Sequence, residues 1–173
     1  ALGGSRAAGI DSFAAAIANN TSSYGASATN AVAIGPFARS IERAAIAIGT
    51  ETYANGRDSY ALSAYGRTDQ PYGATLFGAR AASRIIGKAA YGSGFLAGQG
   101  EVQGGILVCT AQTTNGTATK LTSTNGAATA TNQVILPSSS AYAFSGIIVA
   151  RQQASGGTAS AAWEIKGLIR REG

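Results

Sequence analysis

A five-residue motif recurs at a fixed interval in the first half of this chain. Its clearest copies are Ala-Val-Ala-Ile-Gly at residues 31–35 and Ala-Ile-Ala-Ile-Gly at residues 45–49, and weaker copies occupy residues 59–63 and 73–77. The copies therefore begin at positions 31, 45, 59 and 73, a constant step of fourteen. A short and constant period indicates a stack of similar coils, in which each repeat contacts its neighbours, instead of an ordinary globular core.

An earlier copy departs from this interval. We place it at residues 14–18, so the step from its last residue, Ala18, to Gly35 is seventeen instead of fourteen. The longer step predicts a loop insertion between the first two coils. Residues 1–80 therefore form the repeat region.

Within each copy the second and fourth residues are mostly apolar and the third is small. This alternation with a period of two is typical of a short strand with one buried face. We expect each coil to enclose a row of Ile and Leu side chains, while Gly35 and Gly49 end the strands in turns with positive φ. The residues assigned to this structural core are Ile17, Val32, Ile34, Ile46, Ile48, Leu62 and Leu76.

The length of the repeat predicts an oligomer. Fourteen residues of extended chain span about 46 Å, which leaves two strands of roughly five residues once the turns are taken out. Charged residues make up only 12% of the chain and Gly numbers 24, so large side chains that fill a wide core are scarce. We therefore favour parallel packing of identical chains over a monomeric solenoid, which usually has longer coils.

The two best copies resemble the YadA-like head repeat of trimeric autotransporter adhesins, which is also found in phage fibres. The resemblance covers residues 10–80, although Ser63 and Phe77 stand where the repeat has Gly. It implies a left-handed parallel β-roll that forms a homotrimer with its small and apolar faces inward.

The rest of the chain predicts a different architecture. Residues 81–104 read as a Gly-rich connector, and residues 105–173 as a small antiparallel β-sandwich or jelly-roll-like domain, which makes the whole chain all-β. Its turns are marked by Asn115-Gly116 and Asn125-Gly126. The predicted strands are 106–112, 117–123, 132–136, 142–151 and 161–170. The predicted core side chains of this sheet are Tyr142, Phe144 and Trp163.

The C-terminal part also has a resemblance of its own. Residues 131–137, 141–144 and 161–165 look similar to C-terminal domains of phage tail-fibre and other virion proteins. In that family the domain is longer, so we expect an incomplete sheet here. Met is absent, including at position 1, and we therefore expect a fragment or a processed product.

The composition excludes several kinds of chemistry. There is no His, which removes Ser-His-Asp and Cys-His nucleophiles and His-based metal sites. The single cysteine, Cys109, is expected to be a small buried hydrophobe. We interpret the carboxylates of Glu51, Asp58 and Asp69 as surface charge and not as a glycosidase pair. We expect no catalytic residue, cofactor or metal, and hence no enzyme.

Charge and aromatic residues bear on possible partners. The net charge is +5, but the basic residues are mostly scattered singly, so we expect no nucleic-acid binding. The sequence contains no apolar run long enough to cross a membrane, so we expect no membrane insertion. Aromatic residues in the looser halves of the repeats either contact sugars or proteins or cover the coil ends, and we favour the second role. They are Tyr24, Phe37, Tyr53, Tyr65 and Tyr72.

These observations predict a structural and adhesive fibre or spike protein of a phage particle. Its expected partners are two further copies of itself, other tail or capsid proteins, and a host cell-surface glycan or protein, and its expected location is the virion. Three alternatives remain open: the head domain of a bacterial trimeric adhesin, a fibre-borne polysaccharide hydrolase, and an architectural tail or capsid component without a receptor.

Overall fold

The computed structural model describes residues 1–2, 5–15, 23–153 and 156–173. These residues form strands and no helix, so the predicted all-β fold is confirmed. They divide into two units, Ala1–Gln133 and Val134–Gly173.

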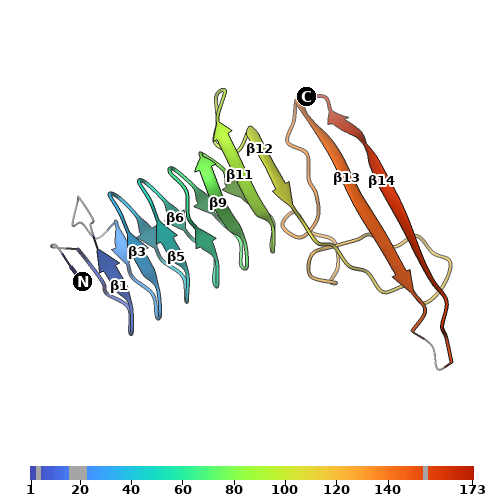
Figure 1. Cartoon of the computed structure of the whole chain (residues 1–173), viewed down its shortest axis with the longest axis horizontal. Coiled ribbons are helices and arrows are strands. Elements are labelled where there is room, and N and C mark those ends of the chain that lie inside the picture. Colours follow the sequence, from blue (N-terminus) through green and yellow to red (C-terminus); the bar gives the residue numbers. More distant parts are fainter. Residues whose placement is uncertain (3–4, 16–22, 154–155) are drawn as a thin grey trace. The chain divides into compact units, whose positions relative to one another are not determined.

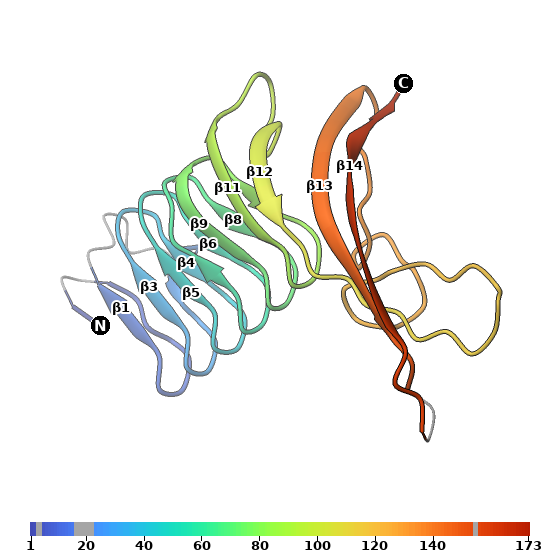
Figure 2. The ribbon, with the colours of Figure 1, turned by 45° about the vertical axis from the view of Figure 1, so that its right-hand side comes forward.

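The first unit is a stack of coils whose strands alternate between two sheets (Figures 1 and 2). The seven-stranded sheet contains β1 (Phe13–Ala15), β3 (Val32–Ile34), β5 (Ile46–Ile48), β7 (Tyr60–Ala61), β9 (Ala74–Ala79), β11 (Ala89–Gly94) and β12 (Val102–Ile106). The five-stranded sheet contains β2 (Gly25–Ala26), β4 (Arg39–Ser40), β6 (Tyr53–Ala54), β8 (Arg67–Thr68) and β10 (Ala82–Ser83). Apart from the β11–β12 pair, neighbouring strands in both sheets are parallel. The predicted stack of parallel coils is therefore confirmed.

The register of the seven-stranded sheet follows the period of the sequence. Val32 pairs with Ile46, Ile46 with Tyr60, and Tyr60 with Ala74. The first copy of the motif is displaced from the position we expected, because Val32 pairs with Phe13 and not with Ala15. The alanine-rich run that begins at Ala14 fits the motif in more than one alignment, and the outward-facing Phe13 fixes the true one.

The interior of each coil is filled by small side chains. The third position of each motif is 0% exposed, and so is the inward residue of most strands in the five-stranded sheet. The buried side chains of the seven-stranded sheet are Ala14, Ala33, Ala47, Ala61, Thr75 and Ala90, and those of the five-stranded sheet are Ala26, Ser40, Ala54, Thr68 and Ser83. None of the described Val, Ile, Leu, Phe, Tyr or Trp side chains is fully buried.

Our expectation that the coils enclose Ile and Leu is therefore wrong. So short a coil brings its two sheets so close together that only Ala, Ser and Thr fit between them. The alternation of the motif is correct, but the face that the coil buries is the small one.

The buried hydroxyl groups hold the turns of the coils. Ser40 donates to the carbonyl of Ala45 at 2.6 Å, and Ser83 makes the equivalent bond to Lys88 at 2.7 Å. Thr52 donates to the carbonyl of Ser63 in the next coil at 2.7 Å. Because these hydroxyls satisfy backbone carbonyls that water does not reach, they make a polar interior compatible with burial.

The corners of the coils depend on residues in the left-handed backbone region. Gly35 and Gly49 have φ values of 115° and 135°, which confirms the predicted turns. Non-glycine residues share this geometry, and their backbone N–H groups donate to the preceding coil: Ala44 to Thr29 at 2.9 Å and Glu51 to Pro36 at 2.8 Å are examples. The non-glycine corner residues of the stack are Asp11, Asn30, Phe37, Ala44, Glu51, Asp58, Tyr65, Tyr72 and Arg80.

Residues 81–104 are not a connector. They contribute β10 and β11 to the stack, and β12 then turns back and pairs antiparallel with β11. The side-chain amide of Gln103 on β12 accepts a hydrogen bond from the N–H of Ala82 at 2.8 Å and donates to its carbonyl at 3.2 Å. β10 is an edge strand of the five-stranded sheet. The Gln103 side chain thus forms the two hydrogen bonds to its backbone that a neighbouring strand would form.

None of the three strands predicted between residues 106 and 136 forms. After β12, residues 107–133 contain one isolated bridge, between Thr110 and Thr122. The predicted turn at Asn125-Gly126 is present, with a φ of 55° at Asn125. The side chain of Asn132, which is 4% exposed, bonds to Thr124, Ala127 and Thr129 and holds this loop in place of a sheet.

The second unit is an antiparallel hairpin of β13 (Ser140–Arg151) and β14 (Ser160–Arg171). Both strands were predicted, and the antiparallel sheet is confirmed, but it consists of this one pair instead of a sandwich. Ile148 pairs with Trp163 and Phe144 with Gly167, so one face of the hairpin is apolar. Trp163 is 51% exposed and Phe144 39% exposed, so the predicted burial of these rings in a core is wrong: a single pair of strands offers nothing to cover them.

The narrow interior yields a prediction for stability. Ala47 is 0% exposed and pairs with Ala33 and Ala61 in the adjacent coils. Ala47→Leu should lower the free energy of unfolding by about 1–3 kcal/mol or more, the usual cost of overpacking. Urea denaturation measures this loss. The neighbouring Ile48→Leu, on the outward face, should change stability much less, and equal effects of the two substitutions would contradict the observed burial pattern.

Candidate functional site

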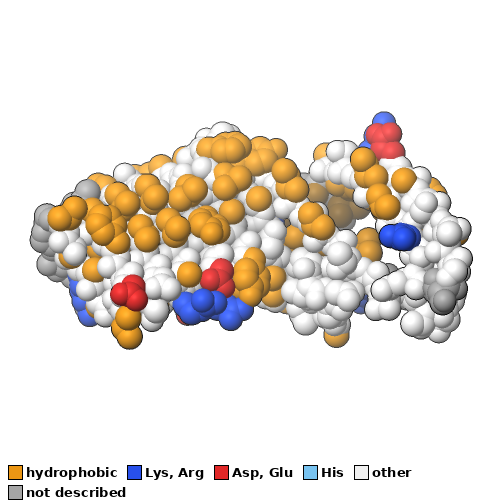
Figure 3. All heavy atoms as spheres, turned by 60° about the horizontal axis from the view of Figure 1, so that its bottom comes forward, with side chains coloured by type: hydrophobic (Ala, Val, Ile, Leu, Met, Phe, Trp, Pro, Cys, Tyr) orange, Lys and Arg blue, Asp and Glu red, His pale blue; other side chains and the backbone are white. Residues whose placement is uncertain are grey.

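The outward side of the seven-stranded sheet carries two rows of large apolar side chains. We call this surface the apolar face. The second motif positions contribute Phe13, Val32, Ile46 and Tyr60, and the fourth positions contribute Ile34, Ile48, Leu62 and Leu76. Figure 3 shows hydrophobic side chains gathered in a band along the stacked coils. Since each coil repeats the same backbone, the rows are straight and evenly spaced, about 4.8 Å from strand to strand.

The residues assigned from the sequence to the repeat core meet on this face. Val32, Ile34 and Ile46 are half-buried, whereas Ile48, Leu62 and Leu76 are each about 40% exposed. Ile17 lies outside the described residues. The motif therefore identifies the right residues and places them together, but they face away from the coil.

The apolar face continues from the end of the last copy of the motif onto β11. The rings of Phe77 and Tyr91 stack with their centroids 5.5 Å apart, and they are 61% and 44% exposed. Tyr91 lies across Gly104 on β12, where an added Cβ would stand 2.5 Å from the ring. Tyr91 was not predicted as a site residue, because residues 81–104 carry no copy of the motif. The pairing of Tyr91 with Gly104 in antiparallel strands is the feature that would have indicated its position.

A surface of this kind is costly to leave in water. Fully burying one Val, Leu, Ile or Phe side chain stabilises a protein by about 1.5–3 kcal/mol. Single exposed apolar residues are common on proteins, but a contiguous apolar patch usually marks an interaction site. The apolar face is thus the strongest candidate for an interface on this chain.

The outward side of the five-stranded sheet is polar and basic by comparison. Arg39, Tyr53 and Arg67 lie on three successive strands in register. Arg67 is paired with Asp69 at 2.6 Å, and burial raises the pKa of the Tyr53 hydroxyl, with smaller contributions from Tyr24 and Glu51. This side presents side chains suited to polar contacts.

Three of the five looser-half aromatic residues lie at the corners of the coils. The rings of Tyr24 and Phe37 meet edge to face at 5.2 Å. Phe37, Tyr65 and Tyr72 occupy corner positions with positive φ. Of this group, Tyr53 is the one that lies within a strand.

Two of the three carboxylates singled out from the sequence, Asp58 and Asp69, are held in ion pairs. Asp58 accepts from Arg43 at 3.0 Å and lies 3.4 Å from Arg57, and Asp69 is held by Arg67. In the described part of the chain, no group of three or more His, Cys, Asp or Glu side chains is placed to hold a metal ion. Cys109 is half-buried, and burial raises the pKa of its thiol.

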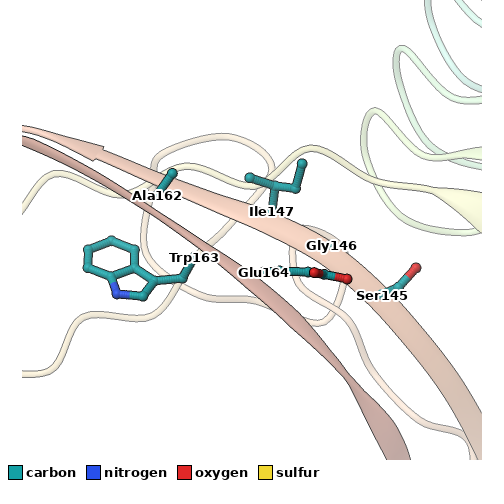
Figure 4. Close-up of a pocket in the computed structure, with 6 residues that line it drawn as sticks. All are labelled: Ser145, Gly146, Ile147, Ala162, Trp163 and Glu164. Carbon is teal, nitrogen blue, oxygen red and sulfur yellow. The ribbon is translucent and has the colours of Figure 1, made fainter.

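The hairpin has an open hollow lined by side chains of both strands (Figure 4). The lining residues are Ser145, Gly146, Ile147, Ala162, Trp163 and Glu164. Because Ile147 pairs with Glu164 and Ile148 with Trp163, Ile147 and Trp163 lie on opposite faces of the ribbon. The side chains that line the hollow therefore do not all lie on one face of the ribbon.

The loop between β11 and β12 is held by one carboxylate. Glu101 Oε2 accepts the backbone N–H groups of Leu96, Ala97 and Gly98 at 3.1, 2.6 and 2.7 Å. The bonds from Gly98 and Ala97, and to a smaller extent Leu96, hold the pKa of the Glu101 carboxyl below its ordinary value. Three donors on one oxygen fix the backbone of this loop.

No match was found when the chain was compared with protein-family models, with curated proteins and with solved structures. Among the residues that the structure describes, none belongs to a helix long and apolar enough to span a membrane.

The Glu101 contacts predict a pH-dependent loop. Because the pKa is lowered in the folded protein, these contacts stabilise the loop above the ordinary pKa of Glu, and the effect is lost as the pH falls through the lowered value. The amide resonances of residues 96–98 should shift together in that range in an NMR titration. Glu101→Gln should abolish the transition, and its persistence in that variant would assign it to another group.

Proposed function

We propose that this chain is a structural and adhesive fibre or spike protein of a phage particle, in which three copies associate and attach the particle to a host surface. The observation that carries the proposal is the apolar face: one chain buries only small side chains inside its coils and leaves its large ones outside. The resemblances of both halves of the sequence to phage fibre proteins favour this setting.

The shape of the apolar face favours a second copy of the same chain as its partner. Its rows repeat at the spacing of the strands, and an identical chain packed in parallel has rows with the same spacing. Side chains of one chain then fit between those of the next over the whole stack. Ile48 and Leu62, about 40% exposed in one chain, become buried in such an assembly.

The surfaces that remain exposed support binding without turnover. In the assembly the five-stranded sheets and the corners stay in contact with solvent. They present Arg39, Tyr53 and Arg67 on short strands held by neighbouring coils. Aromatic and arginine side chains on a rigid scaffold make good contacts to sugars and proteins.

Charge placed in the apolar face should prevent assembly. The intact protein should sediment at three times the chain mass of 17.2 kDa. Ile48→Lys introduces an unpaired charge where the chains meet, and should shift the protein to monomers in sedimentation equilibrium. Tyr53→Lys, with the same charge on the other sheet, should leave the trimer intact. A monomeric wild-type protein would refute the proposed assembly.

Attachment is tested on particles. Particles lacking this protein should adsorb to host cells at a strongly reduced rate, and adding back the wild-type chain during assembly should restore it. Normal adsorption without the protein would indicate an architectural component without a receptor. Release of oligosaccharide from host surface polysaccharide by the purified protein would instead indicate a hydrolase.

A further inference from the structure

An arginine at one corner of the stack is held between two aromatic rings. The Arg80 guanidinium lies 4.0 Å from the ring centroid of Phe95 and 4.6 Å from that of Tyr65. Its backbone is fixed as well, because its N–H donates to the carbonyl of Ala64 at 3.0 Å and its carbonyl accepts from Gly100 at 3.0 Å. Contacts with two rings restrict the orientation of the guanidinium plane and engage its faces, not its N–H groups.

The edge of this guanidinium has no partner in the described part of the chain. Arg80 makes none of the ion pairs and none of the side-chain hydrogen bonds there. The acidic residue on the same corner is Glu51, and Tyr65 stands between the two along the stack. Glu101 is occupied by three backbone N–H groups. The side chain of a surface arginine is usually flexible. Because the Arg80 side chain is held by two rings and pairs with no carboxylate among the described residues, it is a preformed hydrogen-bond donor site.

The loop that supplies Phe95 is tied to the coil. The side-chain amide of Gln99 donates to the backbone carbonyls of Tyr65 and Ala81. The backbone carbonyl of Gln99 accepts from the Arg84 guanidinium at 3.4 Å. Together with the Glu101 contacts, these bonds fix both sides of the arginine before any ligand arrives. Such preorganisation lowers the entropic cost of binding.

We propose that Arg80, with Tyr65 and Phe95, binds an oxyanion, a carboxylate or phosphate group carried by a sugar of the host surface. Two edge N–H groups of a guanidinium match two oxygens of such a group, and the aromatic rings offer apolar contact to the sugar. The inference rests on the proposed attachment function and specifies its ligand chemistry.

Arg57 provides a matched control within the same chain. It also lies over a ring, 5.5 Å from the centroid of Tyr72, and donates to the Tyr72 hydroxyl. Unlike Arg80, it is paired with a carboxylate, at 3.4 Å from Asp58. Two of its donor nitrogens are therefore already engaged, and its loss should not affect an oxyanion ligand.

The test is calorimetric titration of the purified full chain with three oligosaccharides of equal length: an oligogalacturonate, a phosphorylated oligomannose and a neutral oligogalactose. The acidic probes should bind and the neutral one should not, and the difference between the two acidic probes identifies the preferred oxyanion. Arg80→Gln should weaken acidic binding about 10- to 100-fold, as expected for lost charge-assisted hydrogen bonds. Arg57→Gln should leave it unchanged.

Two controls keep the outcome clear. If Arg80→Gln fails to fold, the ring resonances of Tyr65 and Phe95 in the wild-type protein should shift on titration with the acidic probe, and unchanged resonances overturn the site. Equal binding of neutral and acidic probes, or equal losses in the two arginine variants, also overturns it. A trimer that is required for adsorption but binds no oxyanion refutes the site alone, whereas oxyanion binding by a protein dispensable for adsorption refutes the attachment function alone.

Discussion

The close approach of two short parallel sheets governs the whole stack. Each coil has room only for Ala, Ser and Thr inside, and each pair of coils is joined by backbone hydrogen bonds at strands and corners alike. Small side chains contribute little hydrophobic stabilisation on their own. The larger apolar residues lie on the outer surface, so the same constraint that makes the coil thin makes that surface apolar.

Much of this arrangement was predictable because the backbone and the sequence share one period. The interval from Val32 to Ile46 to Tyr60 sets the register directly, and the two glycines Gly35 and Gly49 mark the turns. Which face of each strand points into the coil was not predictable from the alternation alone. A period of two separates small from large residues, but only the distance between the sheets decides that Ala47 is inside and Ile48 outside.

The rest of the chain lacked such a periodic guide. The coil that contains β10 and the start of β11 is built from residues without the motif, so Gln103 and Tyr91 gain their roles from partners brought close by the fold. Likewise, Phe95 and Tyr65 are distant in the sequence, and nothing local indicates that Arg80 lies between them. The strands β13 and β14 were predicted correctly from the sequence. Upstream of them, the side chain of Asn132 bonds the backbone of Ala127 and Thr129, a contact that strand patterns do not indicate.

The paired edge at Gln103 has a mechanical consequence. Hydrogen bonds between coils run along the stack, so a pulling force along that direction opens one rung at a time, beginning at an end. Without the Gln103 contacts, the backbone edge of β10 would be unpaired, and separation of the coils would start there. The side-chain amide of Gln103 hydrogen-bonds both the N–H and the carbonyl of Ala82, and therefore raises the force needed to separate the first coil. The closed edge therefore strengthens the stack at the strand where tension would otherwise open it first.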